Sequence, residues 1–306
     1  MGAPAPAPVV VVANPTAGRG KAGRRIGAVG SILRSLRVDH EIRVAGSPGE
    51  MEQTCRSLGE AGAEIVAVLG GDGTASCAAN GLLGTGAALA VLPAGTGDDF
   101  AHAIGAGSFR EAIGLLANPK TTPIDVVRMQ VGGVDRCFVN IAGAGFDSEV
   151  NETANAMTVN LGGTGTYVAA LLKTLSRFSP ARYDLTIDGA PTTVDAMLVV
   201  VGNGPSYGGG MRVLPQASLV DGALDVCIVE ALSKGAFLRA FPKVYSGRHA
   251  THARVRMLRA RAVAVEANRG LQVYADGERV GPLPARLEVM PAALPVVVGP
   301  DAKGIR

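Results

Sequence analysis

The sequence predicts an α/β domain built on a parallel sheet, followed by a β-rich domain with a sandwich-like arrangement of antiparallel strands. With 306 residues, the chain is too long for one small core and suits two domains of ordinary size. Over the first 120 residues, apolar runs alternate with segments of helical spacing, which is the pattern of βαβ units. After Asp125, runs of period two dominate, as in antiparallel strands joined by hairpins.

The elements of the first domain follow from their apolar patterns. The segment Val9–Ala13 is apolar throughout, as expected for a parallel strand that is buried on both faces. The elements expected after it are a helix with apolar positions from Ile26 to Leu36, a strand at 40–45, a helix around 49–62, a strand at 65–69, a helix from about 74, a strand at 89–92 and a helix that opens at Asp99.

In the second domain, alternation of apolar and polar residues predicts strands at 182–187, 196–201, 224–229, 262–266, 271–275 and 286–290. Helices are expected near 164–177 and 234–246. The apolar run 295–298 is expected to return to the first domain as a buried strand. We therefore place the α/β domain at 1–125 together with 294–306, and the β-rich domain at 126–293.

The composition excludes several classes of protein. Hydrophobic residues make up 47% and charged residues 18%, which is typical of a soluble globular protein. Aromatic residues are only 4% and tryptophan is absent, so a stacking platform for nucleic acid is not expected. The four cysteines are widely separated and predict reduced thiols, with neither a disulfide framework nor a zinc site.

Nothing in the sequence predicts export or a membrane span. The N-terminal MGAPAPAP lacks a charged region followed by an apolar stretch, so we expect a flexible tail rather than a secretory signal. No stretch of 18 apolar residues occurs. We therefore expect a cytoplasmic protein, which can still touch a bilayer at its surface.

Three glycine-rich polar turns follow strands of the predicted parallel sheet, at residues 14–21, 70–74 and 93–99. Ligands of open parallel sheets bind beyond the carboxyl ends of the strands, and glycines let backbone N–H groups wrap an anion. Each turn alone is compatible with an ordinary connection, but three together indicate a polyphosphate. Asp72 stands inside the second turn, where a carboxylate would repel phosphate unless a metal ion intervened. Asp72 is therefore expected to hold Mg²⁺.

Two common nucleotide motifs fit poorly. The first turn lacks the first glycine and the Ser or Thr of a Walker A loop, because Pro15 and Ala22 stand there. A G-x-G-x-x-G match occurs at Gly18–Gly23, but four residues separate it from its strand. Dinucleotide binding on this match stays open as a weak alternative.

The chain resembles the diacylglycerol kinase catalytic family, which includes bacterial lipid kinases and is related to sphingosine kinases. The residues that carry the resemblance across both halves are NPTAGRG at 14–20, GGDGT at 70–74, PAGTGDDFA at 93–101, GAGFD at 143–147, GGG at 208–210, LPQA at 214–217, DGALDV at 221–226 and DGE at 276–278. The segment at 70–74 is shared with NAD kinases, whereas the segments of the second half favour lipid kinases.

The resemblance implies a two-domain enzyme in which ATP and a lipid meet between the domains. The residues implied to bind ATP are Asn14, Pro15, Thr16, Gly18, Gly20, Gly70, Gly71, Gly73, Thr74, Gly95, Thr96 and Gly97. The residues implied to organise a catalytic Mg²⁺ are Asp72, Asp99 and Asp125, and those implied to bind a structural Mg²⁺ are Ser218, Asp221 and Ala223. Glu278 is implied to be the general base, and Asp147 is a candidate for contact with the lipid headgroup.

The chain also departs from the family pattern. Relatives usually carry Asn-Asp where Asp98-Asp99 stands, and often Arg where His102 stands. Ala75-Ser76-Cys77 replaces a segment that commonly contains Asn-Glu. These departures predict a more negative phosphate site, with weaker ATP binding, a higher Mg²⁺ requirement or a changed activity.

Residues 231–261 contain eight Lys or Arg and no Asp or Glu. Such a stretch can attract an anionic membrane, and it is equally compatible with a solvated basic face. The apolar segment 236–238 could add insertion into the bilayer.

We expect an ATP- and Mg²⁺-dependent lipid kinase at the inner membrane surface, with diacylglycerol as the first candidate substrate. NAD kinase and a non-catalytic nucleotide- or lipid-binding relative are the alternatives. The expected partner is a lipid at the membrane surface and not nucleic acid; the oligomeric state stays open, a homodimer included.

Overall fold

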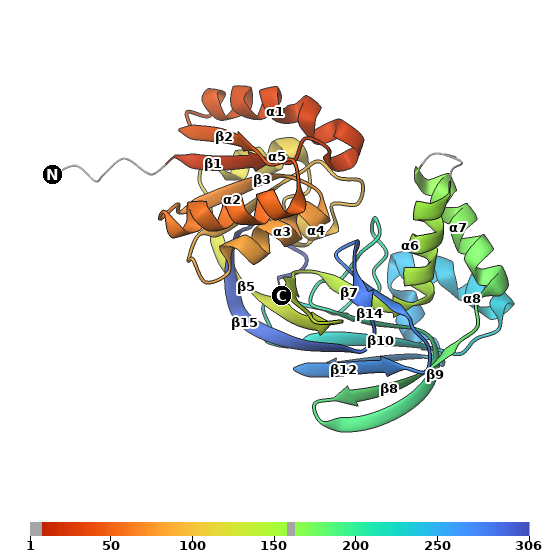
Figure 1. Ribbon diagram of the computed structural model, residues 1–306. Coiled ribbons are helices and arrows are strands. Elements are labelled where there is room, and N and C mark those ends of the chain that lie inside the picture. Colours follow the sequence, from red (N-terminus) through yellow and green to blue (C-terminus); the bar gives the residue numbers. More distant parts are fainter. Residues whose placement is uncertain (1–7, 158–162, 306) are drawn as a thin grey trace.

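The computed structural model describes residues 8–157 and 163–305, in two parts that lie one above the other in Figure 1. Most of the expected N-terminal tail therefore lies outside the described residues. The first part contains a parallel sheet in the order β2–β1–β3–β4. Its strands are β1 (Val9–Ala13), β2 (His40–Val44), β3 (Ile65–Gly70) and β4 (Ala88–Pro93).

Helices pack around this sheet (Figure 1). They are α1 (Ala17–Ser35), α2 (Pro48–Glu60), α3 (Asp72–Leu82), α4 (Asp99–Ala103) and α5 (Phe109–Leu115). Local sequence fixes two of their starts: the Ser47 side chain accepts from the Glu50 N–H at α2, and Ser108 forms a capping box with Glu111 at α5.

The second part is built from antiparallel strands, as expected for the β-rich domain. Its strands are β5 (Thr121–Val131), β6 (Val134–Phe138), β7 (Ile141–Gly145), β8 (Ala181–Ile187), β9 (Ala190–Gly202), β10 (Leu224–Glu230), β11 (Val255–Ala260), β12 (Ala262–Ala267), β13 (Gln272–Ala275), β14 (Glu278–Pro282) and β15 (Ala285–Val297). They follow the order β14–β13–β7–β9–β8–β12–β15, with β10 and β11 paired beside β9 and with β5 and β6 beside β15. The predicted fold class is confirmed.

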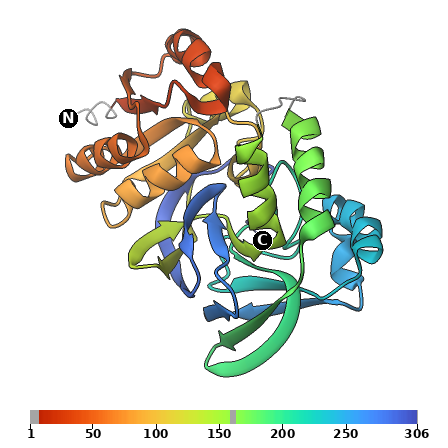
Figure 2. The same cartoon turned by 45° about the vertical axis from the view of Figure 1, so that its right-hand side comes forward.

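A group of helices lies on one side of the second sheet, and the tops of α6 and α7 reach the level of the first part (Figures 1 and 2). It consists of α6 (Phe146–Ala156), α7 (Gly163–Arg177), α8 (Lys234–Ala240) and the 3₁₀ helices η1 (Phe241–Ser246) and η2 (Arg248–Thr251). Its core contains aromatic contacts of Phe146 with Phe178 and Phe237, at centroid distances of 5.3 and 4.7 Å.

Two long strands join the parts. β5 and β15 pair antiparallel from Ala285 to Val297, with a shift of register between Met290 and Leu294. At its end β15 also pairs in parallel with β4, through Val296 and Leu89. The limits proposed at 125/126 and 293/294 thus fall inside continuous strands, and the division into domains stays a prediction.

The interior is apolar. All four cysteines are free thiols, and Cys55, Cys77 and Cys227 are buried. Within residues 8–157 and 163–305, no helix is long and apolar enough to cross a membrane.

Candidate functional site

The three glycine-rich turns meet at the carboxyl ends of β1, β3 and β4. A Cβ at Gly18 would lie 2.0 Å from the Ala94 carbonyl oxygen, and one at Gly71 would lie 3.0 Å from the Gly95 Cα. The backbones of the turns therefore touch, which only glycine permits at these positions. Asn14 adds a side-chain link, since its Nδ2 donates to the Thr74 hydroxyl at 3.2 Å.

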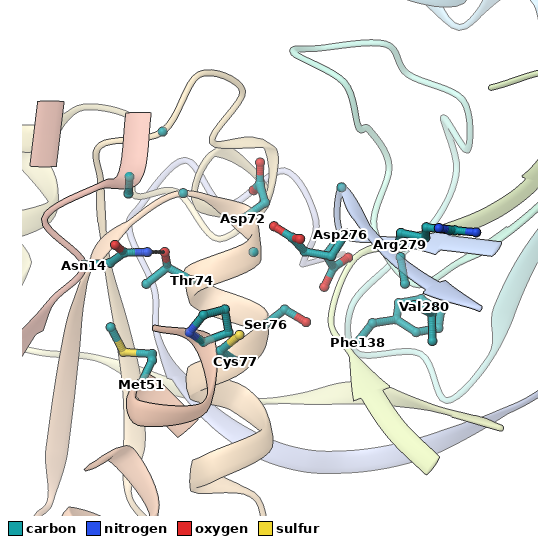
Figure 3. A pocket seen from close by; sticks show the side chains of 18 of the residues that line it. Asn14, Met51, Asp72, Thr74, Ser76, Cys77, Phe138, Asp276, Arg279 and Val280 are labelled. Carbon is teal, nitrogen blue, oxygen red and sulfur yellow. Dashed lines mark hydrogen bonds between the residues drawn. The ribbon is translucent and has the colours of Figure 1, made fainter. Parts of the chain in front are cut away.

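These turns form one wall of a cavity of about 540 Å³ (Figure 3). The predicted site residues that line it are Asn14, Gly18, Gly71, Asp72, Gly73, Thr74, Gly95, Thr96, Gly97 and Glu278. Four other predicted residues belong to the same turns but not to the wall: Pro15, Thr16, Gly20 and Gly70. The opposite wall comes from the second part and includes Phe138, Asp276 and Arg279 (Figure 3).

Asp72 opens α3 and also holds the start of α4. Its carboxylate accepts the Asp99 N–H at 3.2 Å and the Phe100 N–H at 2.9 Å. Burial raises the pKa of Asp72 to about 7, and the nearby carboxylates of Asp99 and Asp276 act in the same direction. Asp72 is half-buried, and its two hydrogen bonds to the start of α4 give it a part in the fold as well.

Asp99 stands beside Asp72 and is buried. Its two oxygens accept the N–H groups of Gly209 at 2.7 Å and Gly210 at 2.8 Å, both from the second part. A Cβ at Gly97 would lie 3.0 Å from Asp99 Oδ2 and 3.4 Å from Asp72 Oδ2. The two carboxylates thus converge on Gly97, although Asp99 itself does not line the cavity.

Glu278 brings the second part to the first turn of α3. Its Oε1 lies 2.8 Å from where a Cβ of Gly73 would be. The turn before Glu278 is held by Asp276, a residue with a φ of 47°, whose carboxylate accepts the N–H groups of Val139, Asn140 and Ile141 at 3.0–3.1 Å. The buried Asp276 therefore fixes the loop that presents Glu278.

The extra carboxylate of the third turn, Asp98, is buried and bonded within that turn. Asp98 Oδ1 accepts the Gly95 N–H at 2.7 Å, and burial raises the Asp98 pKa. Lys21 Nζ donates to the Gly95 carbonyl at 3.3 Å, and its charge opposes that shift. Asp98 does not line the cavity but bonds Gly95, which does, and the expectation that Asp98 makes the phosphate site more negative stays a prediction. His102 is exposed, as expected.

Sequence reasoning missed several lining residues. Arg136 on β6 and Arg279 on β14 bring cations to the cavity, where they also pair with Glu52 at 3.7 Å and Glu152 at 3.5 Å. Pro48 and Met51, at the start of α2, add an apolar edge, and Ser76 and Cys77 line the face of α3. Val134, Arg136 and Phe138 stand two residues apart on β6 and therefore share one face of the strand. This spacing is the one sequence signal that could have indicated the wall.

The donor set near Gly97 fits a catalytic magnesium. Mg²⁺ in kinase sites is bound by one or two carboxylates together with substrate phosphates. Asp72 supplies one such carboxylate, and the carboxylate of Asp99 lies beside it. No basic side chain among the described residues pairs with either of the two. No group of three or more His, Cys, Asp or Glu positioned for a metal occurs among the described residues.

Asp125 is placed elsewhere. Its buried carboxylate accepts the N–H groups of Gly222 at 2.6 Å and Ala292 at 2.8 Å, and it does not line the cavity. Asp125 therefore does not line the cavity, and its part in organising the catalytic magnesium and its waters stays a prediction.

The carboxylate implied to bind a structural magnesium, that of Asp221, is already paired with the cation of Arg259. Asp221 Oδ2 accepts from the Arg259 guanidinium, while Asp221 Oδ1 accepts the Ala223 N–H at 3.2 Å. The carboxylate implied as a metal ligand is already paired, so Ser218, Asp221 and Ala223 fit a bound cation poorly. No chemistry is derived through this site.

A second, apolar cavity of about 70 Å³ lies between the second sheet and its helices. Its apolar lining residues are Phe146, Leu198, Met211, Val213, Cys227, Val229, Leu232, Phe237, Ala240, Phe241, Val244 and Val255. Asp147, Tyr207 and His249 add polar atoms. His249 is buried, which lowers its pKa, and its Nε2 lies 3.0 Å from the Val213 carbonyl oxygen.

Asp147 is the acidic group of this apolar cavity. Its Oδ2 accepts from the Tyr207 hydroxyl at 3.2 Å, while Oδ1 has no partner among the described residues. Burial raises the Asp147 pKa to about 6. A buried acceptor without a donor is costly, so a ligand that supplies a donor would be favoured here.

Two family models match the chain. Residues 8–129 match the diacylglycerol kinase catalytic domain, and residues 140–298 match the YegS C-terminal NAD kinase beta sandwich-like domain. A diacylglycerol kinase of Mycobacterium tuberculosis (strain ATCC 25618 / H37Rv) is 36% identical over 94% of each chain. "Probable lipid kinase YegS-like" of Stenotrophomonas maltophilia (strain K279a) is 29% identical over 84% of this chain and 86% of that protein.

A solved structure agrees in fold. A diacylglycerol kinase from Bacillus anthracis str. Sterne superposes with a TM-score of 0.73 at 23% identity, covering 96% of this chain and 98% of that one. The family models and the 36% identical relative together identify the family. The chain therefore belongs to the diacylglycerol kinase family of lipid kinases.

Proposed function

We propose that this protein transfers the γ-phosphate of ATP to a lipid hydroxyl with the help of Mg²⁺, and that diacylglycerol is its substrate. The observation that carries the proposal is the cavity in which three glycine turns of the first part face Glu278 of the second. Phosphoryl transfer needs positioned reactants, a metal on the phosphates and an acceptor for the hydroxyl proton. This cavity holds residues for each task.

The roles follow from position. The backbone N–H groups of Gly71 and Gly97, with the first turn of α3, bind the phosphates. Asp72 binds Mg²⁺, which when present neutralises charge on the phosphates. Glu278, at that same first turn, takes the proton of the lipid hydroxyl.

The apolar cavity supports a lipid acceptor. Its walls are suited to acyl carbons, and Asp147 Oδ1 offers an acceptor for the single hydroxyl of diacylglycerol when the lipid first binds, before that hydroxyl moves to Glu278 for transfer. One turn of the chain links this apolar cavity to the cavity lined by the glycine turns, which we call the nucleotide cavity. Tyr207 bonds Asp147 in the apolar cavity, and Gly209 and Gly210, which follow it closely, bond Asp99 beside Asp72. Lipid and nucleotide thus have neighbouring binding regions.

We further propose that the helical end of the second part contacts the cytoplasmic face of an anionic membrane. Val168 and Leu172 on α7 and Leu238 on α8 are exposed apolar side chains. Lys234 Nζ donates to the Ser176 carbonyl, which holds the start of α8 to the end of α7. Because α8 and η1 also line the apolar cavity, this face would let a lipid leave the bilayer.

Part of the basic stretch is not available for such contact. Arg254 pairs with Glu230 at 3.4 Å, and Arg259 pairs with Asp221. The attraction therefore rests on the remaining basic residues, including Arg239 on α8 and Lys243 on η1.

Transfer of labelled γ-phosphate from ATP·Mg²⁺ tests the activity. The acceptors are diacylglycerol, sphingosine, ceramide and NAD in mixed anionic micelles. Labelled phosphatidic acid is expected, and Asp72→Asn should lower its rate by about 10²–10³-fold, the range for loss of one group that stabilises transition-state charge. Asp98→Asn is the matched control, since Asp98 lies in the neighbouring turn but outside the cavity, and it should keep activity.

Each outcome of this assay has a distinct meaning. Labelled NADP would identify a NAD kinase, and no product with retained ATP binding would indicate a non-catalytic relative. Near-normal turnover of Asp72→Asn would contradict the role given to Asp72.

Sedimentation with phosphatidylglycerol vesicles tests the membrane face. The double variant Leu172→Glu/Leu238→Glu should bind less, whereas Leu36→Glu, an exposed leucine at the end of α1, should bind normally. Equal binding of all three proteins would contradict this face.

A further inference from the structure

The segment 207–211 forms a closed turn of unusual backbone geometry. The Tyr207 N–H donates to the Met211 carbonyl at 3.1 Å, and the Met211 N–H returns to the Tyr207 carbonyl at 3.0 Å. The three glycines between them have φ values of 62°, 80° and 98°. Three successive left-handed residues are strained for any side chain, so the turn depends on glycine at each position.

The tip of this turn enters the carboxylate cluster of the nucleotide cavity. The N–H groups of Gly209 and Gly210 donate to the two oxygens of Asp99. The Gly209 nitrogen also lies 3.3 Å from where a Cβ of Gly97 would be, a point that Asp72 Oδ2 approaches to 3.4 Å. The second part thus fixes the orientation of the carboxylate that neighbours Asp72.

The base of the turn lies in the apolar cavity. The Tyr207 hydroxyl donates to Asp147 Oδ2 at 3.2 Å, and both side chains line that cavity. Asp147 is only 6% exposed, so this bond is shielded from solvent and sensitive to whatever binds Asp147.

The base is also fastened to the loop that presents Glu278. Asn140 Nδ2 donates to the Ser206 carbonyl at 2.8 Å. The backbone N–H of Asn140 donates in turn to Asp276. The hydrogen bond from Asn140 to Ser206 holds the base of the turn in place. A movement of Tyr207 should therefore displace the three glycines that follow it rather than the base.

We infer that Tyr207 is a positioning residue that couples the acceptor cavity to the nucleotide cavity. The coupling runs from Asp147 through the Tyr207 hydroxyl and the glycine turn to Asp99, and it rests on the proposed function for the identity of the acceptor. A lipid hydroxyl that bonds Asp147 orders this chain of contacts and thereby holds Asp99 in place beside Asp72. Lipid and Mg²⁺-nucleotide should therefore raise each other's affinity by the same factor.

Calorimetry of adenylyl-imidodiphosphate with Mg²⁺, with and without dioctanoylglycerol in nonionic micelles, measures this factor. For the unmodified protein we expect the lipid to lower the nucleotide Kd about fivefold or more, the lower limit typical of coupled sites. Tyr207→Phe should reduce the factor to about one, while its Kd without lipid stays within about twofold of the unmodified protein. Gly209→Ala should also lose the factor, with weaker nucleotide binding even without lipid.

Two matched variants control for side effects. Tyr245→Phe removes a hydroxyl from an exposed tyrosine of η1. Gly189→Ala places a side chain at a φ of 84° in the β8–β9 turn, where nothing lies within 4 Å. Both should keep the full coupling factor.

The result separates this inference from the proposed function. If the protein phosphorylates dioctanoylglycerol but its nucleotide Kd does not change when the lipid is added, the coupling is wrong and the kinase proposal stands. A full factor in Tyr207→Phe would likewise overturn the role of Tyr207. If no lipid is phosphorylated, the kinase proposal fails and the coupling fails with it.

Discussion

The two cavities each contain an aspartate carboxylate, but the surroundings of these carboxylates differ. Asp72 in the nucleotide cavity accepts two backbone N–H groups and lies near the carboxylate of Asp99. Asp147 in the apolar cavity accepts one tyrosine hydroxyl and is surrounded by apolar side chains. Burial raises the pKa of both, to about 7 for Asp72 and about 6 for Asp147.

The difference indicates which ligand each cavity suits. Two neighbouring carboxylates repel each other until a cation lies between them, which favours Mg²⁺ at Asp72. A single carboxylate with one unpartnered oxygen in an apolar wall needs only a hydrogen-bond donor, which a lipid hydroxyl supplies. The same residue type is thus suited to a metal in one cavity and to a headgroup in the other.

The sharpest test of this division uses Glu278, which lines the nucleotide cavity. Glu278→Gln keeps the shape of the side chain but removes the proton acceptor, so turnover should fall by about 10³-fold, within the range for general base catalysis. Nucleotide and lipid affinities should change little, because Glu278 is not needed to bind either. Steady-state kinetics with diacylglycerol, together with calorimetry of the nucleotide, measure both quantities.

Arg279→Gln is the control for Glu278, since it alters the next residue of β14 and leaves the acceptor in place. It should retain most of the turnover. A loss in Glu278→Gln that appears only in the nucleotide Kd would give Glu278 a binding role instead of a catalytic one.

The second test separates the two carboxylates by ligand. Asp147→Asn should raise the KM for diacylglycerol about tenfold, equivalent to the loss of about 1.4 kcal/mol from one hydrogen bond to a charged group. The KM for ATP, measured at low lipid concentration to limit coupling, should change much less. An equal rise in both KM values would show that Asp147 supports the fold as a whole rather than the lipid.

Sequence patterns predicted one cavity far better than the other. The strands β1, β3 and β4 are apolar runs that end in glycine turns, so both the sheet and the loops at its edge are readable locally. The apolar cavity is lined by residues from Phe146 to Val255 that have no shared motif, and only folding brings them together. Asp147 was indicated by resemblance alone.

The missed elements have physical reasons. β7 (IAGAG) has only Ala and Gly after Ile141, so it largely lacks the β-branched side chains that mark a strand. β5 carries Pro123, Asp125 and Arg128 among its apolar positions, so its pattern is interrupted. The magnesium role of Asp125 was implied by resemblance alone, and its partners Gly222 and Ala292 are distant in the sequence and known only from the fold.

The third test uses pH. The Asp147 pKa is raised from its ordinary 3.8 to about 6 by burial, so the carboxylate is ionised at pH 7 and protonated at pH 5. A lipid hydroxyl bonds the ionised form better, so the KM for diacylglycerol should rise about fivefold as pH falls from 7 to 5, since about nine tenths of the carboxylate becomes protonated. In Asp147→Asn this rise should be absent. A parallel rise in both proteins would place the titrating group elsewhere.

The smallest expected effect concerns Asp221, a carboxylate that is already paired with the cation of Arg259. Arg259 pairs with Asp221 on an exposed surface, so Arg259→Leu should cost at most about 1 kcal/mol of stability. With Arg259 in place, a chelator should leave the melting temperature unchanged; in Arg259→Leu, Mg²⁺ should raise it, because Asp221 is then free to bind a cation. Arg254→Leu, which breaks the similarly exposed pair with Glu230, should show no response to Mg²⁺. A chelator-sensitive melting temperature in the unmodified protein would show that a metal, and not Arg259, neutralises Asp221.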